Sequence, residues 1–345
     1  MAEGLVNRGY RVDLVLGKKQ GEYLEQVPAK VNLIDLRVKK LLLSLNLVGA
    51  YLKKQKPAVL ISANERVNIV ALLAKKIYRS KTKLIISVHV NNTEQMARQG
   101  ASIYRKIIIR LARWTYKWAD SVVAVSEGVA ADVAALFSVP PEKIHVIYNP
   151  IINSNLGDKI NEPVEHPWFK QEKCPVVIGV GRLNRQKDFL TLIKSLREIK
   201  KVIADTKLII LGEGQQRREL ENEIKMLRLE KDVYMPGFVE NPYSYLKNSS
   251  VFVLSSAWEG FGNVLVEAMA TGTPVVSTDC PSGPAEILKN GKYGPLVPVG
   301  DANSLAREVV AILKDPPAAE LLIRRAHDFT VDKAVDHYIS MIDNF

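Results

Sequence analysis

Two glutamates, Glu259 and Glu267, stand eight positions apart, with the glycine-flanked aromatic Gly260-Phe261-Gly262 directly after the first of them. Ionised carboxylates accept hydrogen bonds and therefore suit the paired hydroxyl groups of a sugar. A helix that starts just after the second glycine would point its N-terminal N–H groups at an anion such as a phosphate. Carboxylates that can bind sugar hydroxyls, next to a helix N-terminus that can bind a phosphate, indicate a nucleotide-sugar site.

The elements that must position these residues are a strand, a turn and a helix. Val251–Leu254 is a short apolar run rich in β-formers, which predicts a buried strand, and the turn spans 255–262. A helix is expected over Asn263–Ala270, because its apolar residues recur at helical spacing, and a strand follows at Pro274–Thr278. A lone glutamate on such a helix is most often only solvated, but these neighbours favour a binding site.

Two cations follow another predicted strand. Gly181 ends the apolar strand Val176–Val180, and Arg182 and Lys187 occupy the loop before a helix expected at 189–199. Open parallel sheets bind ligands at the carboxyl ends of their strands, and a diphosphate needs charge-assisted donors. The loop therefore suits a diphosphate, and the alternative is that both cations are only exposed loop residues.

A pair of glycines, Gly212 and Gly214, follows a third predicted strand, Lys207–Leu211. A dinucleotide-binding fingerprint needs a third glycine at the position where this chain has Arg217. The sequence therefore argues against a nicotinamide-dependent enzyme.

Several blocks around these residues follow one another in an order known from one family. The chain resembles the retaining glycosyltransferases of family 4, or group 1 glycosyltransferases, whose signature of Glu, seven residues and Glu is here Glu259-GFGNVLV-Glu267. Further family-like blocks are VGRLNRQKDFLTLI from Val180, LGEGQQRREL from Leu211, MPGFVEN from Met235 and YGPLVPVGD from Tyr293. The resemblance covers nearly the whole chain. It implies the α/β GT-B fold, in which two doubly wound, Rossmann-like domains face each other across a cleft.

The resemblance also implies an activity. A sugar would pass from a nucleotide diphosphate donor, with a UDP-sugar expected, to an acceptor hydroxyl with retention, without a metal or another cofactor. Glu259 would bind hydroxyls of the transferred sugar and Glu267 those of the ribose, while His89 would lie near the sugar or acceptor. Glu259 and His89 are thus the expected catalytic residues, and no residue stands out as a nucleophile. The implied donor-binding residues are Gly181, Arg182, Lys187, Phe238, Val239, Gly260, Phe261, Gly262, Asn263, Val264 and Glu267.

The first half of the chain alternates strands and helices, which is typical of a doubly wound α/β domain. The expected strands are Arg11–Leu16, Ala58–Ser62, Lys83–Val88 and Ser121–Val125, and the expected helices are Ala2–Arg8, Leu41–Lys54, Arg66–Tyr78 and Ile103–Trp118. His89 follows the strand Lys83–Val88 and opens a polar loop at the expected ligand edge. A lone histidine is more often structural than functional, and both interpretations stay open here.

The positive charge of the chain is confined to its first half. Residues 1–165 hold 25 Lys and Arg against 14 Asp and Glu, whereas the rest of the chain is balanced. This asymmetry suggests an anionic partner such as a lipid surface or a lipid diphosphate. Nucleic acid is not expected, because no nucleic-acid-binding motif accompanies the charge.

One predicted helix concentrates this charge. Its cations share one helical face beside an apolar line, and these sets are Lys106, Arg110, Arg113 and Lys117, and Ile103, Ile107, Leu111, Trp114 and Trp118. The pattern suits a basic amphipathic helix on an anionic membrane. It equally suits an ordinary helix that packs its apolar line on the sheet and solvates its charges.

The chain of 345 residues is too long for one core, so two domains are expected. We expect an N-terminal domain at 1–165, a nucleotide-sugar-binding domain at 166–330, and a helix at 331–345 that returns to the first domain. Residues 151–173 have linker composition. Because the chain starts inside a predicted helix, the first domain is expected to lack its first strand and the natural protein to begin upstream of Met1.

The expected location is the cytoplasm, with peripheral association at the inner face of the membrane. Cys174 and Cys280 are far apart and match no metal-ligand spacing, so free thiols of a cytosolic protein are expected. The basic half favours a lipid-linked or surface-polysaccharide acceptor. Two alternatives remain: a nucleotide-sugar epimerase on the same fold, which would turn over the donor alone, and a non-catalytic fragment that binds nucleotide without turnover.

Overall fold

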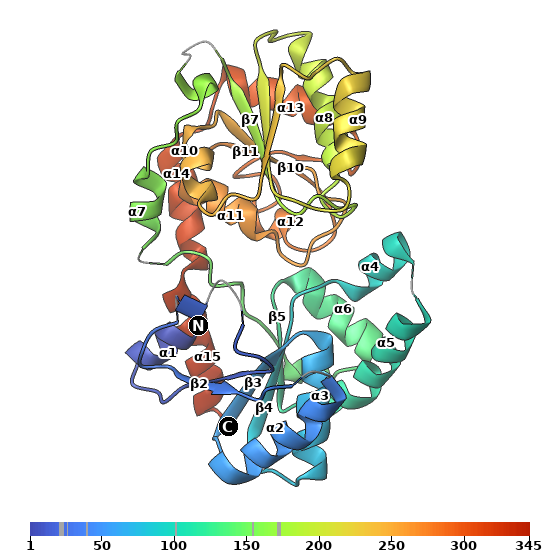
Figure 1. Cartoon of the computed structure of the whole chain (residues 1–345), viewed down its shortest axis with the longest axis vertical. Helices are drawn as coiled ribbons and strands as arrows, with labels where there is room; N and C mark the ends of the chain where they lie inside the picture. The colour runs from blue at the N-terminus through green and yellow to red at the C-terminus, as the bar shows by residue number, and fades with distance from the viewer. Residues whose placement is uncertain (21–23, 26, 39–40, 101, 154, 171–173) are drawn as a thin grey trace. The chain divides into compact units, whose positions relative to one another are not determined.

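The computed structural model describes residues 1–345 apart from 21–23, 26, 39–40, 101, 154 and 171–173 (Figure 1). The chain divides into two compact units: unit 1 is Met1–Pro150 with Val331–Phe345, and unit 2 is Ile151–Thr330. The division at Pro150 differs from the expected boundary at residue 165. Residues 151–165 group with unit 2, where the backbone N–H groups of Ile151 and Ile152 both donate to the carbonyl oxygen of Phe329.

Unit 1 holds two parallel sheets. One has the order β3-β4-β5-β6, and the other is the separate pair β1-β2. The strands are β1 Asp13–Leu16, β2 Asn32–Asp35, β3 Val59–Ala63, β4 Lys83–Val88, β5 Ser121–Ala124 and β6 Ile144–Val146. Strands β4 and β5 are buried almost throughout, as expected of parallel strands with both faces covered.

Four helices of unit 1 begin where a capping side chain follows a strand or turn. Asn64, Asn91, Ser102 and Ser126 each accept a hydrogen bond from a backbone N–H in the first turn of the next helix. The helices are α1 Ala2–Asn7, α2 Leu41–Gln55, α3 Glu65–Ile77, α4 Asn92–Gln99, α5 Ile103–Thr115, α6 Glu127–Phe137 and α15 Val331–Asp343. Short 3₁₀ turns span Tyr116–Trp118 and Pro141–Lys143.

One expectation for unit 1 needs correction. The polar segment after His89 is helix α4 rather than a loop, because the Asn91 side chain caps it. The last helix, α15, groups with unit 1, where Ala334, Tyr338 and Met341 pack in one core cluster with residues of β4 and β5.

Unit 2 is a six-stranded parallel sheet with the order β12-β11-β10-β7-β8-β9. The strands are β7 Val176–Val180, β8 Lys207–Leu211, β9 Val233–Gly237, β10 Val251–Leu254, β11 Val275–Thr278 and β12 Leu296–Val297. The helices are α7 Leu156–Asn161, α8 Phe189–Lys200, α9 Arg217–Met226, α10 Pro242–Asn248, α11 Asn263–Ala270, α12 Pro284–Ile287, α13 Ala302–Lys314 and α14 Ala319–Ala326. Short 3₁₀ turns span Pro167–Lys170 and His327–Phe329.

The strand order of unit 2 fixes where a ligand site can form. From β7 the chain builds outward through β8 to β9, then returns to the other side of β7 to build β10, β11 and β12. Strand order reverses between β7 and β10, and open α/β sheets bind ligands at such a switch point, beyond the carboxyl ends of the strands. The loops that follow β7 and β10 therefore border the expected ligand position.

None of the helices in the described part of the chain is both long and apolar enough to cross a membrane.

Candidate active site

The loops after β7 and β10 are joined into one rim at the switch point of unit 2. The backbone N–H of Ala257 donates to the carbonyl oxygen of Gln186 at 2.7 Å, and the Ser255 hydroxyl donates to that of Lys187 at 2.8 Å. Asp188 then caps α8 by accepting from the N–H of Thr191. These contacts fix the backbone on both sides of Lys187.

A buried ion pair links the two loops. The Lys187 Nζ lies 2.6 Å from the Glu259 Oε1, and the exposed fractions of the two side chains are only 16% and 8%. The Ser256 hydroxyl donates to the same carboxylate oxygen at 2.7 Å, and the Gln186 amide donates to Oε2 at 3.4 Å. A buried charge is tolerated when it is paired and hydrogen-bonded, as this carboxylate is.

The second glutamate of the sequence motif lies in the second turn of α11 and is partly buried. Burial raises the pKa of Glu267, opposed by the positive charge of Lys187 and by a hydrogen bond with Tyr243. Lys187 therefore interacts electrostatically with both glutamates. The structure thus brings together Lys187, Glu259 and Glu267, to which the sequence assigns separate roles toward the diphosphate, the transferred sugar and the ribose.

The start of α11 adds a positive end of a helix dipole to this group. Gly262 precedes the helix in the left-handed conformation, with φ of 100°, and no side chain caps the helix there. The residues 262–264 are thus placed as the sequence predicts, at a helix N-terminus that favours an anion.

The side chain of Phe261 is buried in unit 2, whereas a side chain that binds the donor would have to be accessible. It is only 2% exposed and its ring packs edge-on against that of Phe329, with centroids 5.4 Å apart. Its backbone lies against Gly283, where a Cβ atom would come 1.9 Å from the Phe261 carbonyl oxygen. Phe261 therefore anchors the turn, and only its backbone can serve a ligand.

The glycines after β8 serve the packing of neighbouring loops. A Cβ atom on Gly212 would lie 2.0 Å from the carbonyl oxygen of Gly181, and one on Gly214 would lie 2.2 Å from that of Leu183. The Leu183 N–H also donates to the carbonyl oxygen of Glu213 at 2.9 Å. The glycine pair lets the β7 and β8 loops touch backbone to backbone, which agrees with the absence of a dinucleotide fingerprint.

Replacing Gly212 with alanine is expected to destabilise unit 2. The new Cβ would clash with the backbone of Gly181, and alanine at φ of 136° is strained. We expect the free energy of unfolding to fall by about 2 kcal/mol or more in a denaturant titration. Gly300→Ala is the matched control, because φ there is also positive but nothing lies within 4 Å of the added atom. Equal losses in the two variants would contradict the loop-packing role.

Two further donor-binding candidates are accessible. Arg182 is exposed and takes part in none of the ion pairs among the described residues. Phe238, directly after β9, is 65% exposed, and Val239 is partly buried. An exposed aromatic ring at the carboxyl edge of a sheet can stack on a nucleobase.

His89 lies in unit 1, at the end of β4. Its Nε2 is 2.9 Å from the Ser87 hydroxyl, and a hydrogen bond with Asn149 also holds the ring. Part of the side chain is exposed, but its close protein surroundings lower the pKa of His89, partly opposed by the Asn149 hydrogen bond. At neutral pH the ring is therefore uncharged and can donate or accept a hydrogen bond.

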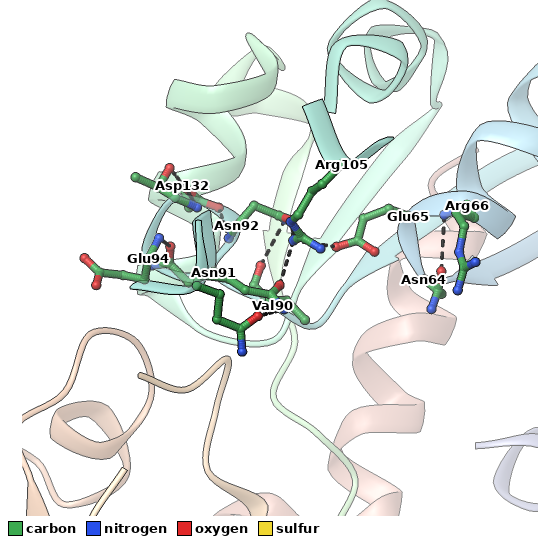
Figure 2. Close-up of polar contacts among 12 residues, drawn as sticks. Asn64, Glu65, Arg66, Val90, Asn91, Asn92, Glu94, Arg105 and Asp132 are labelled. Atoms are coloured by element: carbon green, nitrogen blue, oxygen red, sulfur yellow. Dashed lines mark hydrogen bonds and ion pairs between the residues drawn. The ribbon is translucent and has the colours of Figure 1, made fainter. Parts of the chain in front are cut away.

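A polar cluster around Asn92, three residues after His89 in the sequence, was not anticipated from the sequence (Figure 2). Arg105 of α5 donates to the Asn92 side chain at 2.8 Å and lies 3.8 Å from a Glu65 carboxylate oxygen. Asp132 of α6 accepts from the Asn92 backbone N–H at 2.7 Å. The cluster joins the starts of α3, α4 and α5 to α6 at the carboxyl edge of the sheet, and it holds the segment that follows His89. Its members are scattered over 68 positions of sequence, so no local motif marks them.

Cys280 lies close enough to Glu259 to interact with its charge, but it cannot act as a nucleophile. It is 3% exposed, and burial together with the nearby Glu259 carboxylate raises the pKa of its thiol to about 12. The thiol therefore stays protonated, and the thiolate is the reactive form. Within the described residues, no group of three or more His, Cys, Asp or Glu side chains could hold a metal ion.

Comparison with known proteins gives a consistent result over nearly the whole chain. The model for glycosyl transferases group 1 matches residues 162–329, and the model for glycosyltransferase family 4 matches residues 1–153. An uncharacterized glycosyltransferase of Methanocaldococcus jannaschii is 30% identical over 330 residues, covering 85% of this chain and 80% of that relative.

Two further matches have more specific names. The N-acetylgalactosamine-N,N'-diacetylbacillosaminyl-diphospho-undecaprenol 4-alpha-N-acetylgalactosaminyltransferase of Campylobacter jejuni is 35% identical over 251 residues, 72% of this chain and 65% of the relative. The crystal structure of Anabaena HepE in complex with UDP-glucose matches with a TM-score of 0.79 at 22% identity, covering 100% of this chain and 95% of that one. At this identity the structural match shows the fold.

Proposed function

The chain belongs to the group 1 glycosyltransferases with the GT-B fold, and we propose that it transfers a sugar, with retention, from a UDP-sugar to a hydroxyl of a lipid-linked glycan. The observation that carries this proposal is the Lys187–Glu259 ion pair beside Glu267 and the N-terminus of α11. At this place, cations and a helix dipole that can bind a diphosphate lie next to carboxylates that can accept hydrogen bonds from sugar hydroxyls.

The positive groups are proposed to stabilise the leaving group. As the bond between the sugar and the diphosphate breaks, negative charge grows on the diphosphate oxygens. Lys187, exposed Arg182 and the α11 N-terminus are fixed groups that can neutralise this charge in place of water. Lys187 already interacts with both glutamates, so it is positioned to bridge the diphosphate and the carboxylates.

The glutamates and His89 are proposed to orient the reacting groups. Glu267 would accept from the ribose hydroxyls and Glu259 from those of the transferred sugar, while the neutral His89 ring would hydrogen-bond to the sugar or the acceptor. The Phe238 ring would stack on the base, beside the backbone of Val239. The backbone of Gly181 and of 260–264 would complete the donor site.

We propose that the acceptor hydroxyl attacks the same face of the sugar from which the diphosphate leaves, so that the anomeric configuration is retained. The acceptor hydroxyl would attack the anomeric carbon while the bond to the diphosphate oxygen breaks, and that oxygen would take the hydroxyl proton. Two observations support a route without a covalent enzyme intermediate. Cys280 keeps its proton, and the Glu259 carboxylate is held by three donors, which weakens it as a nucleophile.

The reaction is expected to be independent of divalent metal ions. Lys187, Arg182 and the helix dipole supply the positive charge that a metal would otherwise supply. Initial rates measured with EDTA and with added Mg²⁺ or Mn²⁺ should agree. Loss of the activity in EDTA and its recovery with one of these ions would contradict metal independence.

The donor and acceptor classes are inferred from the relatives. HepE was crystallised with UDP-glucose, and the name of the Campylobacter jejuni relative describes transfer of N-acetylgalactosamine to a diphospho-undecaprenol glycan. UDP-N-acetylgalactosamine and UDP-glucose are therefore the first donors to test, with polyprenyl diphosphate glycans as acceptors. Such an acceptor, together with free cysteines at positions 174 and 280, favours the inner face of the cytoplasmic membrane as the place of reaction.

The experiment that tests the proposed function measures donor consumption with and without acceptor. We expect the full chain to be stabilised in thermal unfolding by one nucleotide class and to consume its sugar conjugate only when a glycan acceptor is present. Conversion of the donor alone into another nucleotide sugar would support the epimerase alternative. Thermal stabilisation without any turnover would support a non-catalytic nucleotide-binding protein.

As the pH is lowered, donor affinity is expected to begin to fall at a higher pH than it would if the pKa of Glu267 were that of an ordinary carboxylate. Because the pKa of Glu267 is raised, protonation removes its acceptor oxygens earlier as pH decreases. Donor affinity should therefore be highest above the pKa of Glu267 and decline as the pH falls through it. Calorimetry with a nucleotide sugar measures this, because the diphosphate of a nucleotide sugar gains no proton in this pH range. Glu267→Gln should bind more weakly and flatten the pH profile, and an unchanged profile would contradict the assignment.

A further inference from the structure

Helix α5 of unit 1 turns an apolar face toward solvent. Ile103, Ile107, Leu111 and Trp114 are 79%, 52%, 38% and 52% exposed, and Tyr104 beside them is 59% exposed. We call these five residues the α5 outer face. Of the two interpretations that the sequence leaves open, the packing of this apolar line on the sheet is not the observed arrangement for these residues.

The described residues of unit 1 leave the α5 outer face largely open to solvent. The helix packs against α3 and α6 through its opposite side, where Ala112 and Thr115 are buried and Ile108 and Ile109 are partly buried. Leaving large apolar side chains in water is unfavourable by about 25 cal/mol for each Å². An exposed row of them along three turns of one helix indicates a surface that something covers.

Cations lie along one edge of this face. They are Lys106, Arg110, Arg113 and Lys117, all of them exposed, and none is in an ion pair within the described part of the chain. Four like charges in a row attract an anionic surface. The same row argues against contact between two copies of this face, because identical cations would be brought together.

A basic pocket continues the face at the end of α3. Its volume is about 510 Å³, and it is lined by Leu72, Lys75, Lys76, Arg79, Ser80 and Trp118. Trp118 stacks edge-on with Trp114, with ring centroids 4.4 Å apart, and the Lys76 Nζ lies 5.8 Å from the centre of the Trp118 ring. Lys75 is paired with Asp120, whereas Lys76 and Arg79 are exposed and lie outside the ion pairs among described residues.

We propose that the α5 outer face docks unit 1 on an anionic lipid bilayer. Ile103, Ile107 and Leu111 would enter the apolar boundary of the bilayer, and the tryptophans would lie at the headgroup level, which aromatic rings with a polar edge prefer. The row of cations would bind lipid phosphates, and the pocket would receive one headgroup between Lys76 and Arg79. Nucleic acid would match the cations but leave the apolar row uncovered.

This inference is independent of the proposed sugar transfer, because it rests on residues of unit 1 and concerns a surface rather than the reaction. Its test is co-sedimentation of the full chain with phosphatidylcholine vesicles, with and without phosphatidylglycerol. We expect binding only with the anionic lipid, and weaker binding at higher salt. Quenching of tryptophan fluorescence by brominated lipid should accompany binding and disappear in W114F/W118F.

Two double variants separate the contributions to docking. Lys106→Gln with Arg110→Gln should weaken vesicle binding by about fivefold for each cation removed. Ile107→Ser with Leu111→Ser should weaken it by about tenfold or more. Both variants should keep the melting temperature and nucleotide affinity of the parent chain, since the changed residues are exposed and lie outside unit 2.

Matched controls remove the same groups from exposed positions of unit 2. Lys231→Gln with Lys314→Gln lowers the net charge equally, and Met226→Ser removes a side chain that is 70% exposed. These controls should bind vesicles like the parent chain. Equal losses in the controls, equal binding to pure phosphatidylcholine, or a concentration-dependent dimer that disappears in the α5 variants would each overturn the proposal.

Discussion

Replacing Lys187 with alanine is expected to reduce kcat by about 10²- to 10³-fold, the effect of removing one charge-stabilising group from a preorganised site. Lys187 is the cation that pairs with Glu259 at 2.6 Å and acts on Glu267. Its loss removes positive charge from the developing diphosphate and leaves a buried carboxylate without its counter-ion. Nucleotide affinity and the free energy of unfolding should therefore fall together, the latter by about 3 kcal/mol or less, since Ser256 and Gln186 still donate to Glu259.

A second variant separates the catalytic loss from the loss of stability. Lys187→Met combined with Glu259→Gln removes both charges, so stability should largely return while the enzyme stays inactive. Arg185→Ala is the matched control, because Arg185 is exposed in the same loop and lies outside the ion pairs of the described chain. Recovery of activity in the double variant, or an equal loss in Arg185→Ala, would contradict the role of Lys187.

Glu267→Ala is expected to weaken binding of the donor nucleotide by about 1 to 3 kcal/mol, which is between fivefold and about 150-fold in affinity. The change removes the acceptor proposed for the ribose hydroxyls and leaves them unpaired in the bound state. It also removes an unfavourably buried carboxylate, so the variant should be no less stable than the parent chain. Calorimetric titration with UDP measures the affinity directly.

Two comparisons make this prediction specific to the ribose. The same titration with the 2′-deoxy nucleotide should show a smaller difference between the variant and the parent chain, because one hydroxyl is already missing. Glu230→Gln, at an exposed position of unit 2, should bind like the parent chain. Unchanged UDP affinity in Glu267→Ala would refute the ribose role.

The local elements of the site could be predicted from the sequence. Strands β4, β7, β8 and β10 and helix α11 have the predicted bounds, because each is a short apolar run or a periodic segment between clear turn residues. The expected family is confirmed by the two family models, which together match nearly the whole chain, and the expected fold by the match to the HepE structure.

The contacts within the site could not be predicted in the same way. Lys187 and Glu259 are 72 positions apart and meet because β7 and β10 are neighbours in the sheet, a consequence of strand order rather than of local pattern. The glycine motif marks Phe261 but not the direction of its ring, which the packing on Phe329 decides. Sequence periodicity likewise shows that α5 is amphipathic without showing which of its two apolar sides is buried.

Retaining sugar transfer is best tested by proton NMR, in which the anomeric signals are followed in real time. The sample contains the full chain, UDP-N-acetylgalactosamine or UDP-glucose, and a polyprenyl diphosphate glycan. Both donors carry the sugar in the α configuration. Retaining transfer predicts that the donor signal disappears only when acceptor is present, that the new glycosidic signal has the small coupling of an α linkage, and that Lys187→Ala suppresses it. A β-linked product, or loss of the donor signal at the same rate without acceptor, would contradict the proposed reaction.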